Sequence, residues 1–285
     1  MVLETALFIF ALAGFSLAGY LDLKTTEFYD WIPYSIIIVS LAISSMLFFS
    51  MGNFSYLANS LISGCIFGAV GLIMYMTKQW GDGDAWLITA LGFALPSADF
   101  LMLKHAGFLQ QAIPFQLTLL FNLFFISFVY IIIYSLAIGL KNKQVNEKFK
   151  EFAAENKLYI IGAFVFVAIS SLFSGFNSLS ILGMKPITYL LFAAPPAFFG
   201  LGLFIFYSKI IEDVAFKKKI SSRKLKAGDV LVKSRWKGLT ENEVKRLKKK
   251  GGSVVVKEGV RFSAVFAVTF LLTHLFGSLV ALFMA

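Results

Sequence analysis

The sequence predicts an all-α polytopic membrane protein with about eight transmembrane helices (six to eight are possible) and a small cytoplasmic α/β insertion before the last helix. Three observations support this fold class. The 285 residues are 58% hydrophobic and only 15% charged, which is too apolar for an ordinary soluble domain. Apolar stretches of ~20 residues, the length needed to cross ~30 Å of hydrocarbon, recur along the chain. The basic residues gather between these stretches.

The expected spans are, in chain order, roughly 3–21, 33–51, 56–77, 85–103, 114–140, 158–174, 187–211 and 262–284. Each has to be helical because backbone polar groups in lipid need internal partners. The fourth span could end early and continue along the membrane surface, since Pro96 and Asp99 interrupt it. Cys65 is the single cysteine, which excludes an intramolecular disulfide and a multi-cysteine zinc site. We expect no metal and no cofactor.

The basic residues orient these spans. With eight spans, all but Lys104 and Lys185 of the 26 Lys and Arg residues fall on one side of the membrane. Sixteen of them lie in 212–261 and five in 141–157. By the positive-inside rule this side is cytoplasmic, and the N-terminus is outside. We therefore expect a multi-pass protein of the cell membrane, in which the first span ends and the fourth span begins at the cytoplasmic face.

Segment 212–261 is predicted to be a small folded insertion. Its sixteen basic and six acidic residues supply a net charge of +10, equal to that of the whole chain. Residues 229–233 and 253–257 indicate two short strands. Between them, Thr240 and Glu243 form a capping-box pattern that starts a helix, and Gly251 ends it. The charge suits anionic lipid headgroups. Nucleic acid is not an expected partner, because no base-reading motif is present.

Two groups of acids meet at the predicted cytoplasmic face. Asp22 follows the first span, and the tetrapeptide 81–84 (Gly-Asp-Gly-Asp) opens the fourth. Two neighbouring carboxylates can activate water when one keeps its proton. The glycines would let the chain turn and let an extended peptide approach Asp84. A simpler interpretation makes the glycines a flexible turn and Asp84 a helix N-cap. The acids Glu147, Glu151 and Glu155 fit a solvated helix face instead.

These motifs resemble those of archaeal preflagellin/prepilin peptidases, which are GxGD aspartyl proteases. The first motif of that family corresponds here to Asp22-Leu23-Lys24 followed by Glu27, Asp30 and then Ile32-Pro33, and the second to Gly81-Asp82-Gly83-Asp84. Segments 227–229, 238–240 and 257–262 also resemble relatives with a cytoplasmic insertion. The resemblance implies Asp22 and Asp84 as the catalytic pair, with Lys24, Asp30, Gly81, Asp82 and Gly83 as supporting motif residues. Asp30 is the second choice for the first catalytic acid.

The resemblance implies an endopeptidase that removes leader peptides from type IV pilin-like or archaellin precursors at the cytoplasmic membrane face. Residues 1–211 would be the membrane protease domain, 212–261 the basic cytoplasmic insertion and 262–285 the last transmembrane helix. The expected partners are such precursors and membrane lipids. A helix N-terminus favours an anion, so we expect Asp84 to be the charged acid at rest and Asp22 the protonated one. One cysteine cannot build the paired CxxC motifs of bacterial relatives, so cleavage without methylation is expected.

Two other functions fit the composition. One is a polytopic transporter whose few acids bind a cation, although here the acids gather at one edge and not at mid-membrane. The other is a non-enzymatic membrane anchor that presents the basic insertion to a partner. The sequence leaves the oligomeric state and the identity of the precursor undetermined.

Overall fold

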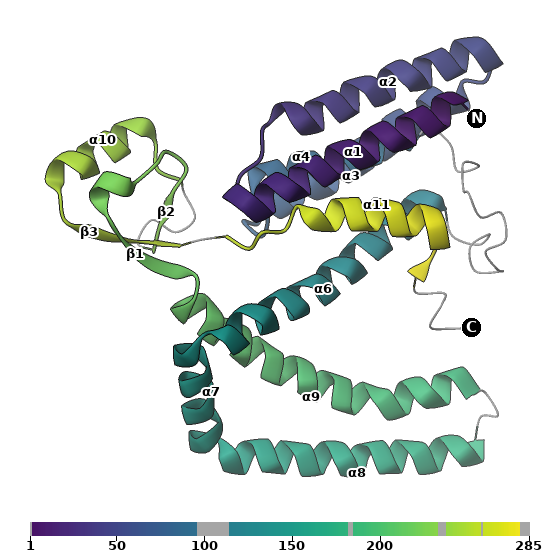
Figure 1. The fold of residues 1–285 in the computed structure, drawn as a ribbon. Helices are drawn as coiled ribbons and strands as arrows, with labels where there is room; N and C mark the ends of the chain where they lie inside the picture. Colours follow the sequence, from purple (N-terminus) through teal and green to yellow (C-terminus); the bar gives the residue numbers. More distant parts are fainter. Residues whose placement is uncertain (1, 96–113, 182–184, 233–237, 258, 280–285) are drawn as a thin grey trace. The chain divides into compact units, whose positions relative to one another are not determined.

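A computed structural model describes residues 2–95, 114–181, 185–232, 238–257 and 259–279, and most of these are helical (Figure 1). The helices are α1 (Val2–Thr25), α2 (Trp31–Met51), α3 (Ser55–Met76), α4 (Asp82–Phe93), α6 (Phe115–Lys141), α7 (Lys143–Glu155), α8 (Lys157–Ile181), α9 (Lys185–Val214), α10 (Glu241–Lys250) and α11 (Ala264–Phe276). The strands are β1 (Lys217–Ser221), β2 (Val230–Leu231) and β3 (Ser253–Lys257).

The chain forms two compact units. The first contains Met1–Tyr130 and Val260–Ala285, and the second contains Ile131–Gly259. Helix α6 begins in the first unit and ends in the second. These limits differ from the sequence-based division at residue 211, because α7, α8 and α9 group with the predicted insertion.

The helices agree in part with the eight expected spans. Four described helices, α1, α2, α3 and α6, are long and apolar enough to cross a membrane. A fifth span results if α7 and α8, which meet at a bend of 76°, count as one. Helix α4 has only 12 residues, and the end of the predicted span 85–103 lies outside the described residues. Helix α11 has 13 residues, and residues 280–284 of the last predicted span also lie outside. The chain is thus a multi-pass membrane protein.

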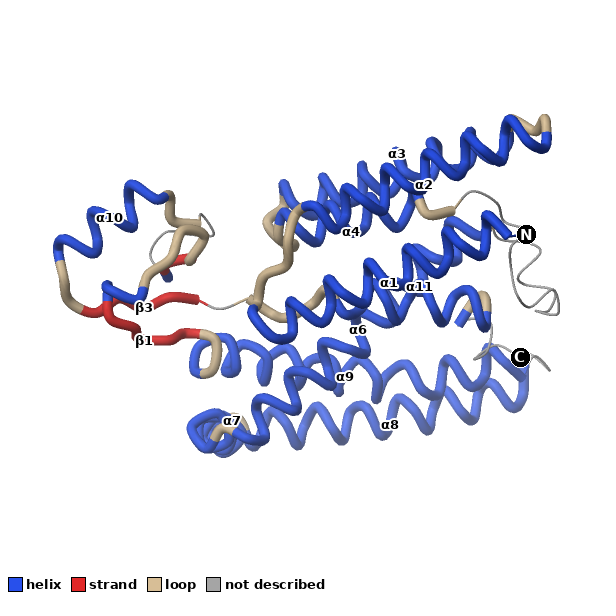
Figure 2. Tube along the Cα trace, turned by 45° about the horizontal axis from the view of Figure 1, so that its top comes forward, coloured by secondary structure: helices blue, strands red, loops and turns tan. Residues whose placement is uncertain are grey.

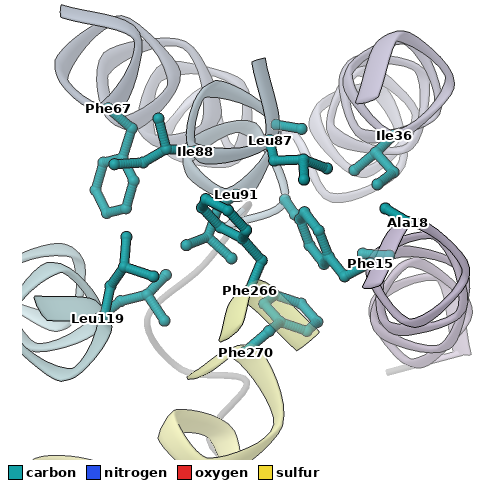
Figure 3. Packing of buried hydrophobic residues seen from close by; sticks show 14 of the residues in the cluster. Phe15, Ala18, Ile36, Phe67, Leu87, Ile88, Leu91, Leu119, Phe266 and Phe270 are labelled. Carbon is teal, nitrogen blue, oxygen red and sulfur yellow. The ribbon is translucent and has the colours of Figure 1, made fainter. Parts of the chain in front are cut away.

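The core of the first unit lies between α1, α4, α6 and α11. Helix α1 packs against α2 and α11, and α3 packs against α4. Figure 3 shows side chains of these helices meeting around Phe15, Leu91, Phe266 and Phe270, which are all buried. Helices in lipid associate through close packing, for which small residues are suited. Gly19 is one of these, since a Cβ there would lie 2.7 Å from the Cα of Ala264. The last helix is therefore held tightly against the end of the first.

The second unit contains a three-stranded sheet of order β1-β3-β2, in which β3 pairs antiparallel with both neighbours. Figure 2 shows β1 and β3 side by side. The predicted strand 253–257 is confirmed. Within the described part of the predicted strand 229–233, which ends at residue 232, β2 covers Val230–Leu231. Strand β1 was missed because three successive lysines, 217–219, hide its alternation. The capping box of Thr240 and Glu243 forms at the start of α10, as predicted. Leu225, Leu239, Val244 and Val256 form the core of this small module.

Candidate active site

Asp22 lies in the last turn of α1 and not beyond the helix, as the predicted span 3–21 had it. Its side chain faces inward, and the residue is only 7% exposed. The carboxylate Oδ2 accepts a hydrogen bond of 2.8 Å from the backbone nitrogen of Ser263, which lies just before α11. This contact joins residues 241 positions apart in the chain. The close packing of α1 against α11 therefore brings the first acid to the start of the last helix.

Asp84 is the third residue of α4, and Gly81 occupies the N-cap position. The interpretation of Asp84 as the N-cap is therefore wrong. Its Oδ1 accepts a hydrogen bond of 3.2 Å from the hydroxyl group of Ser263. One serine thus donates to both acids, through its backbone nitrogen to Asp22 and through its side chain to Asp84. The structure brings the two predicted acids together in the first unit.

Ser263, which bonds to both acids, has no motif in the sequence that predicts this position. It is 2% exposed and directly precedes the apolar helix α11. Its sequence signal is weak, because a serine before an apolar helix is a common N-terminal residue. Here its side chain makes no cap hydrogen bond to α11, so the hydroxyl is available to Asp84. Only the packing of distant helices reveals its position.

The other charged motif residues lie apart from this pair. Lys24, Asp30 and Asp82 are all exposed. The Lys24 ammonium lies 5.8 Å from the centroid of the Tyr20 ring, where it makes a cation–π contact. Asp30 precedes α2 and makes no side-chain cap hydrogen bond. Asp30, the second choice for the first acid, is therefore exposed, whereas Asp22 is buried and bonded to Ser263.

The two motif glycines have different environments. A Cβ at Gly83 would lie 2.7 Å from Cζ of Phe28, so this position needs glycine for close packing of the 22–30 turn on α4. Gly81 is exposed and has an ordinary φ of −70°, so it needs no left-handed backbone. A Cβ there would lie 3.7 Å from Oδ2 of Asp84, in normal contact. A side chain would therefore fit at Gly81, whereas at Gly83 it would require Phe28 to move.

Two non-glycine residues next to the motifs have left-handed backbone conformations. Thr26 follows α1 with φ of 65°, and Lys78 follows α3 with φ of 61°. Such a conformation is strained for a β-branched or long side chain and persists only where the surroundings impose it. Thr26 comes four residues after Asp22, and Lys78 comes three residues before Gly81. Local hydrogen bonds hold both turns at the helix ends, from the Thr26 N–H to the Asp22 carbonyl and from the Gln79 N–H to the Met74 carbonyl.

The electrostatics of Asp84 oppose the sequence-based expectation. Asp84 precedes the predicted span 85–103 and lies outside the four long apolar helices. Burial of its carboxyl group, together with the charge of Asp22, raises the pKa of Asp84 from 3.8 to about 7. Hydrogen bonds from Ser263 and the Gly81 backbone lower the pKa by less. A helix N-terminus contributes only about 0.3–1 kcal/mol in favour of the anion. Desolvation is larger, so the carboxyl group of Asp84 keeps its proton to a higher pH than an ordinary aspartate does.

The site contains no evident metal-binding set. Among the described residues, no three His, Cys, Asp or Glu side chains are grouped so that they could hold a metal ion. The arrangement offers two carboxyl groups that differ in environment, with one serine bridging them. Such a pair can accept a proton from one group and donate a proton to another.

Comparison with known proteins gives two matches. Residues 8–136 match the type IV leader peptidase family. Over 163 residues the chain is 26% identical to a preflagellin peptidase of Methanococcus voltae, and this alignment covers 55% of the chain and 66% of that relative. No solved structure matches. The family match includes Asp22 and Asp84 and ends before Ser263. Residues 8–136, somewhat less than half of the chain, are therefore similar to the type IV leader peptidase family.

Proposed function

We propose that this protein is a membrane aspartyl endopeptidase of the GxGD type, and that it removes leader peptides from type IV pilin-like or archaellin precursors. Asp22 and Asp84 are its catalytic pair. The observation that carries the proposal is the bridging of these two acids by Ser263. Both acids lie within the segment that matches the leader peptidase family.

The chemistry follows from the different environments of the two acids. Asp22 accepts a proton from water as the water oxygen bonds to the scissile carbonyl carbon. Asp84, whose pKa is about 7, donates its proton to the carbonyl oxygen. When the C–N bond breaks, the proton on Asp22 passes to the leaving nitrogen. Asp84 recovers a proton from the hydroxyl group of the intermediate. This assignment reverses the roles expected from helix dipoles alone.

The substrate class is inferred from the relative named a preflagellin peptidase. Precursors of this class have a short charged leader before an apolar helix. An active site at the membrane edge suits them, because the leader is in water while the helix is in lipid. The positive-inside pattern puts the acids at the cytoplasmic face and the N-terminus outside. Segment 212–261 would then be a cytoplasmic insertion that contacts anionic lipids.

The family match favours a peptidase over the transporter and the membrane anchor. A transporter would bind its cation with unpaired acids at mid-membrane. The acid pair here lies instead at the ends of α1 and α4. An anchor would need neither acid.

The test is a cleavage assay on precursor pilins or archaellins with four variants of the full chain. We expect Asp22→Ala and Asp84→Ala to reduce the rate by about 10²- to 10⁴-fold, because each removes a proton donor or acceptor. The matched controls are Asp30→Ala and Asp82→Ala, which remove exposed acids of the same motifs. These should keep most of the activity.

Membrane insertion of every variant is checked by fractionation and by accessibility of the engineered sites. Processing that continues in a correctly inserted Asp22→Ala or Asp84→Ala variant would remove the proposal. Loss of activity in Asp30→Ala with retention in Asp22→Ala would transfer the first catalytic role to Asp30.

A further inference from the structure

The tripeptide Arg261-Phe262-Ser263 connects the two acid motifs to the start of α11. Each of its residues contacts one of the motifs or a direct neighbour of one. Ser263 donates to Asp22 and Asp84, as described above. The other two residues fix the position of Ser263. Arg261 contacts the first motif, and Phe262 contacts the residue before the second motif.

Arg261 holds the first motif. Its guanidinium Nη1 donates a hydrogen bond of 2.5 Å to the backbone oxygen of Leu23, the residue after Asp22. The Tyr130 hydroxyl group donates in turn to the backbone oxygen of Arg261. A charged donor at the last turn of α1 also satisfies a carbonyl that has no partner within the helix. The end of α1 is therefore tied directly to the tripeptide.

Phe262 holds the second motif. It is buried, and its ring centroid lies 5.4 Å from that of Trp80, which immediately precedes Gly81. Trp80 also packs on Phe266, one turn further along α11. Aromatic pairs at such distances have preferred relative orientations, so they set position as well as adding contact area. The register of α11 against the Gly-Asp-Gly-Asp turn is thereby fixed.

We propose that Arg261-Phe262-Ser263 is a positioning element of the active site, in which Ser263 sets the geometry of the two acids and the proton affinity of Asp84. The inference rests on the proposed peptidase function. The backbone N–H of Ser263 can only donate, so it favours an unprotonated oxygen on Asp22. The hydroxyl group of Ser263 stabilises the anion of Asp84 and opposes the effects of burial and of the Asp22 charge. The last helix is thus part of the catalytic machinery, although it lies outside the matched family segment.

The test compares Ser263→Ala with Ser60→Ala, in the full chain, on a precursor that the unaltered protein cleaves. Ser60 is a matched control, because it is buried in the same unit and its hydroxyl group donates to the Phe93 backbone oxygen, away from both acids. We expect Ser263→Ala to lower kcat by about 3- to 10-fold with little change in KM, as for a lost hydrogen bond to an uncharged group, because Asp84 reacts in its protonated form and the backbone bond to Asp22 remains. Loss of the Ser263 hydroxyl group removes a donor that stabilises the Asp84 anion, so the pKa of Asp84 should rise. The decrease in rate with increasing pH should then begin at a higher pH. Ser60→Ala should leave this pH dependence in place.

A second pair of variants distinguishes the loss of the hydroxyl group from an effect on folding. Ser263→Thr and Ser263→Val introduce side chains of nearly equal shape, and only the first keeps a hydroxyl group. We expect Thr to restore most of the activity and the original pH dependence, and Val to behave like Ala.

Equal activity and equal pH dependence of the Thr and Val variants would overturn the inference. If this happened while Asp22→Ala and Asp84→Ala were inactive, the proposed peptidase function would stand without it. Activity in either aspartate variant would instead remove the proposed function.

Discussion

The two units each contain a pair of acids near helix ends, but the pairs have different partners. In the second unit, near the end of α9, Glu212 lies 2.6 Å from the Lys257 ammonium group and Asp213 lies 2.5 Å from that of Lys217. These acids are 48% and 61% exposed. In the first unit, Asp22 and Asp84 share the uncharged donors of Ser263. Within the described part of the chain, neither forms an ion pair.

This difference separates structural acids from acids suited to proton transfer. An exposed carboxylate beside a lysine stays ionised, and such a pair adds only about 0–1 kcal/mol to stability. A buried carboxyl group beside another acid has no compensating cation, so it keeps its proton to higher pH. Perturbed acids of this kind are typical of catalytic sites. The comparison predicts that the same substitution, Asp to Asn, changes stability differently in the two units. It should stabilise the protein above neutral pH in the first unit and have little effect in the second.

The largest expected effect is stabilisation by Asp84→Asn above neutral pH. The pKa of Asp84 is raised from 3.8 to about 7, so this residue's contribution to stability is fully present below pH 4 and is lost as the pH rises through 7. At about 1.4 kcal/mol per pH unit, the loss reaches on the order of 4 kcal/mol. An asparagine at this position carries no charge that would have to be buried. The thermal midpoint of the Asp84→Asn variant in detergent should exceed that of the unaltered protein at pH 8 and equal it near pH 4. A midpoint difference that does not change with pH would contradict the assignment.

The next effect is on the pH dependence of cleavage. In the proposed mechanism Asp84 is the protonated acid, so the rate should fall about tenfold per pH unit above pH 7, when its proton is lost. Initial rates between pH 5 and pH 9 on a cleaved precursor measure this. A rate that rises through pH 7 would restore the roles expected from the helix dipoles, with Asp84 as the base.

A third experiment tests how tightly the acid site is packed. Gly19→Ala should destabilise the protein by about 1–3 kcal/mol, because the new methyl group would meet the backbone of Ala264, which cannot move without α11. Activity should fall with it, as Ser263 is next to Ala264. Gly162→Ala on α8 is the control, since a Cβ there would meet no described atom within 4 Å and would gain up to ~1 kcal/mol of helix propensity. Equal thermal midpoints for the two variants would show that α1 and α11 are not in such close contact.

The smallest effect is expected at the exposed pair. Asp213→Asn removes one ion pair with Lys217 and should change stability by less than about 1 kcal/mol, with no change in cleavage. Raising the salt concentration should reduce even this difference. A larger loss, measured by the thermal midpoint at low and high salt, would show that the second unit also depends on its acids.

Several features of the fold could be predicted from local sequence. The apolar spans of α1, α2, α3 and α6 follow from hydropathy, and the start of α10 follows from the spacing of Thr240 and Glu243. Strand β1 could not be predicted, because its pairing with β3 compensates for three successive lysines. Local pattern therefore sufficed where the stabilising contacts are between close neighbours in the chain.

In the candidate site, too, some residues could be predicted from local sequence and others could not. The positions of Asp22 and Asp84 at two helix ends were predicted from span boundaries and from the Gly-Asp-Gly-Asp motif. Ser263 could not be found, because its partners are 241 and 179 residues away. The raised pKa of Asp84 was not predicted either, since the helix dipole is a local effect and desolvation depends on what covers the carboxyl group.

The sequence by itself determined that this chain is a polytopic helical membrane protein with two acids at span ends and a basic insertion near its C-terminus. Hydropathy, charge spacing and capping patterns are local, and they act before any helix meets another. Only the tertiary structure decided that one serine just before the last helix bridges both acids, and that the pKa of Asp84 is raised. Those properties depend on burial and on contacts between distant segments, which exist only once α1, α4 and α11 have packed together.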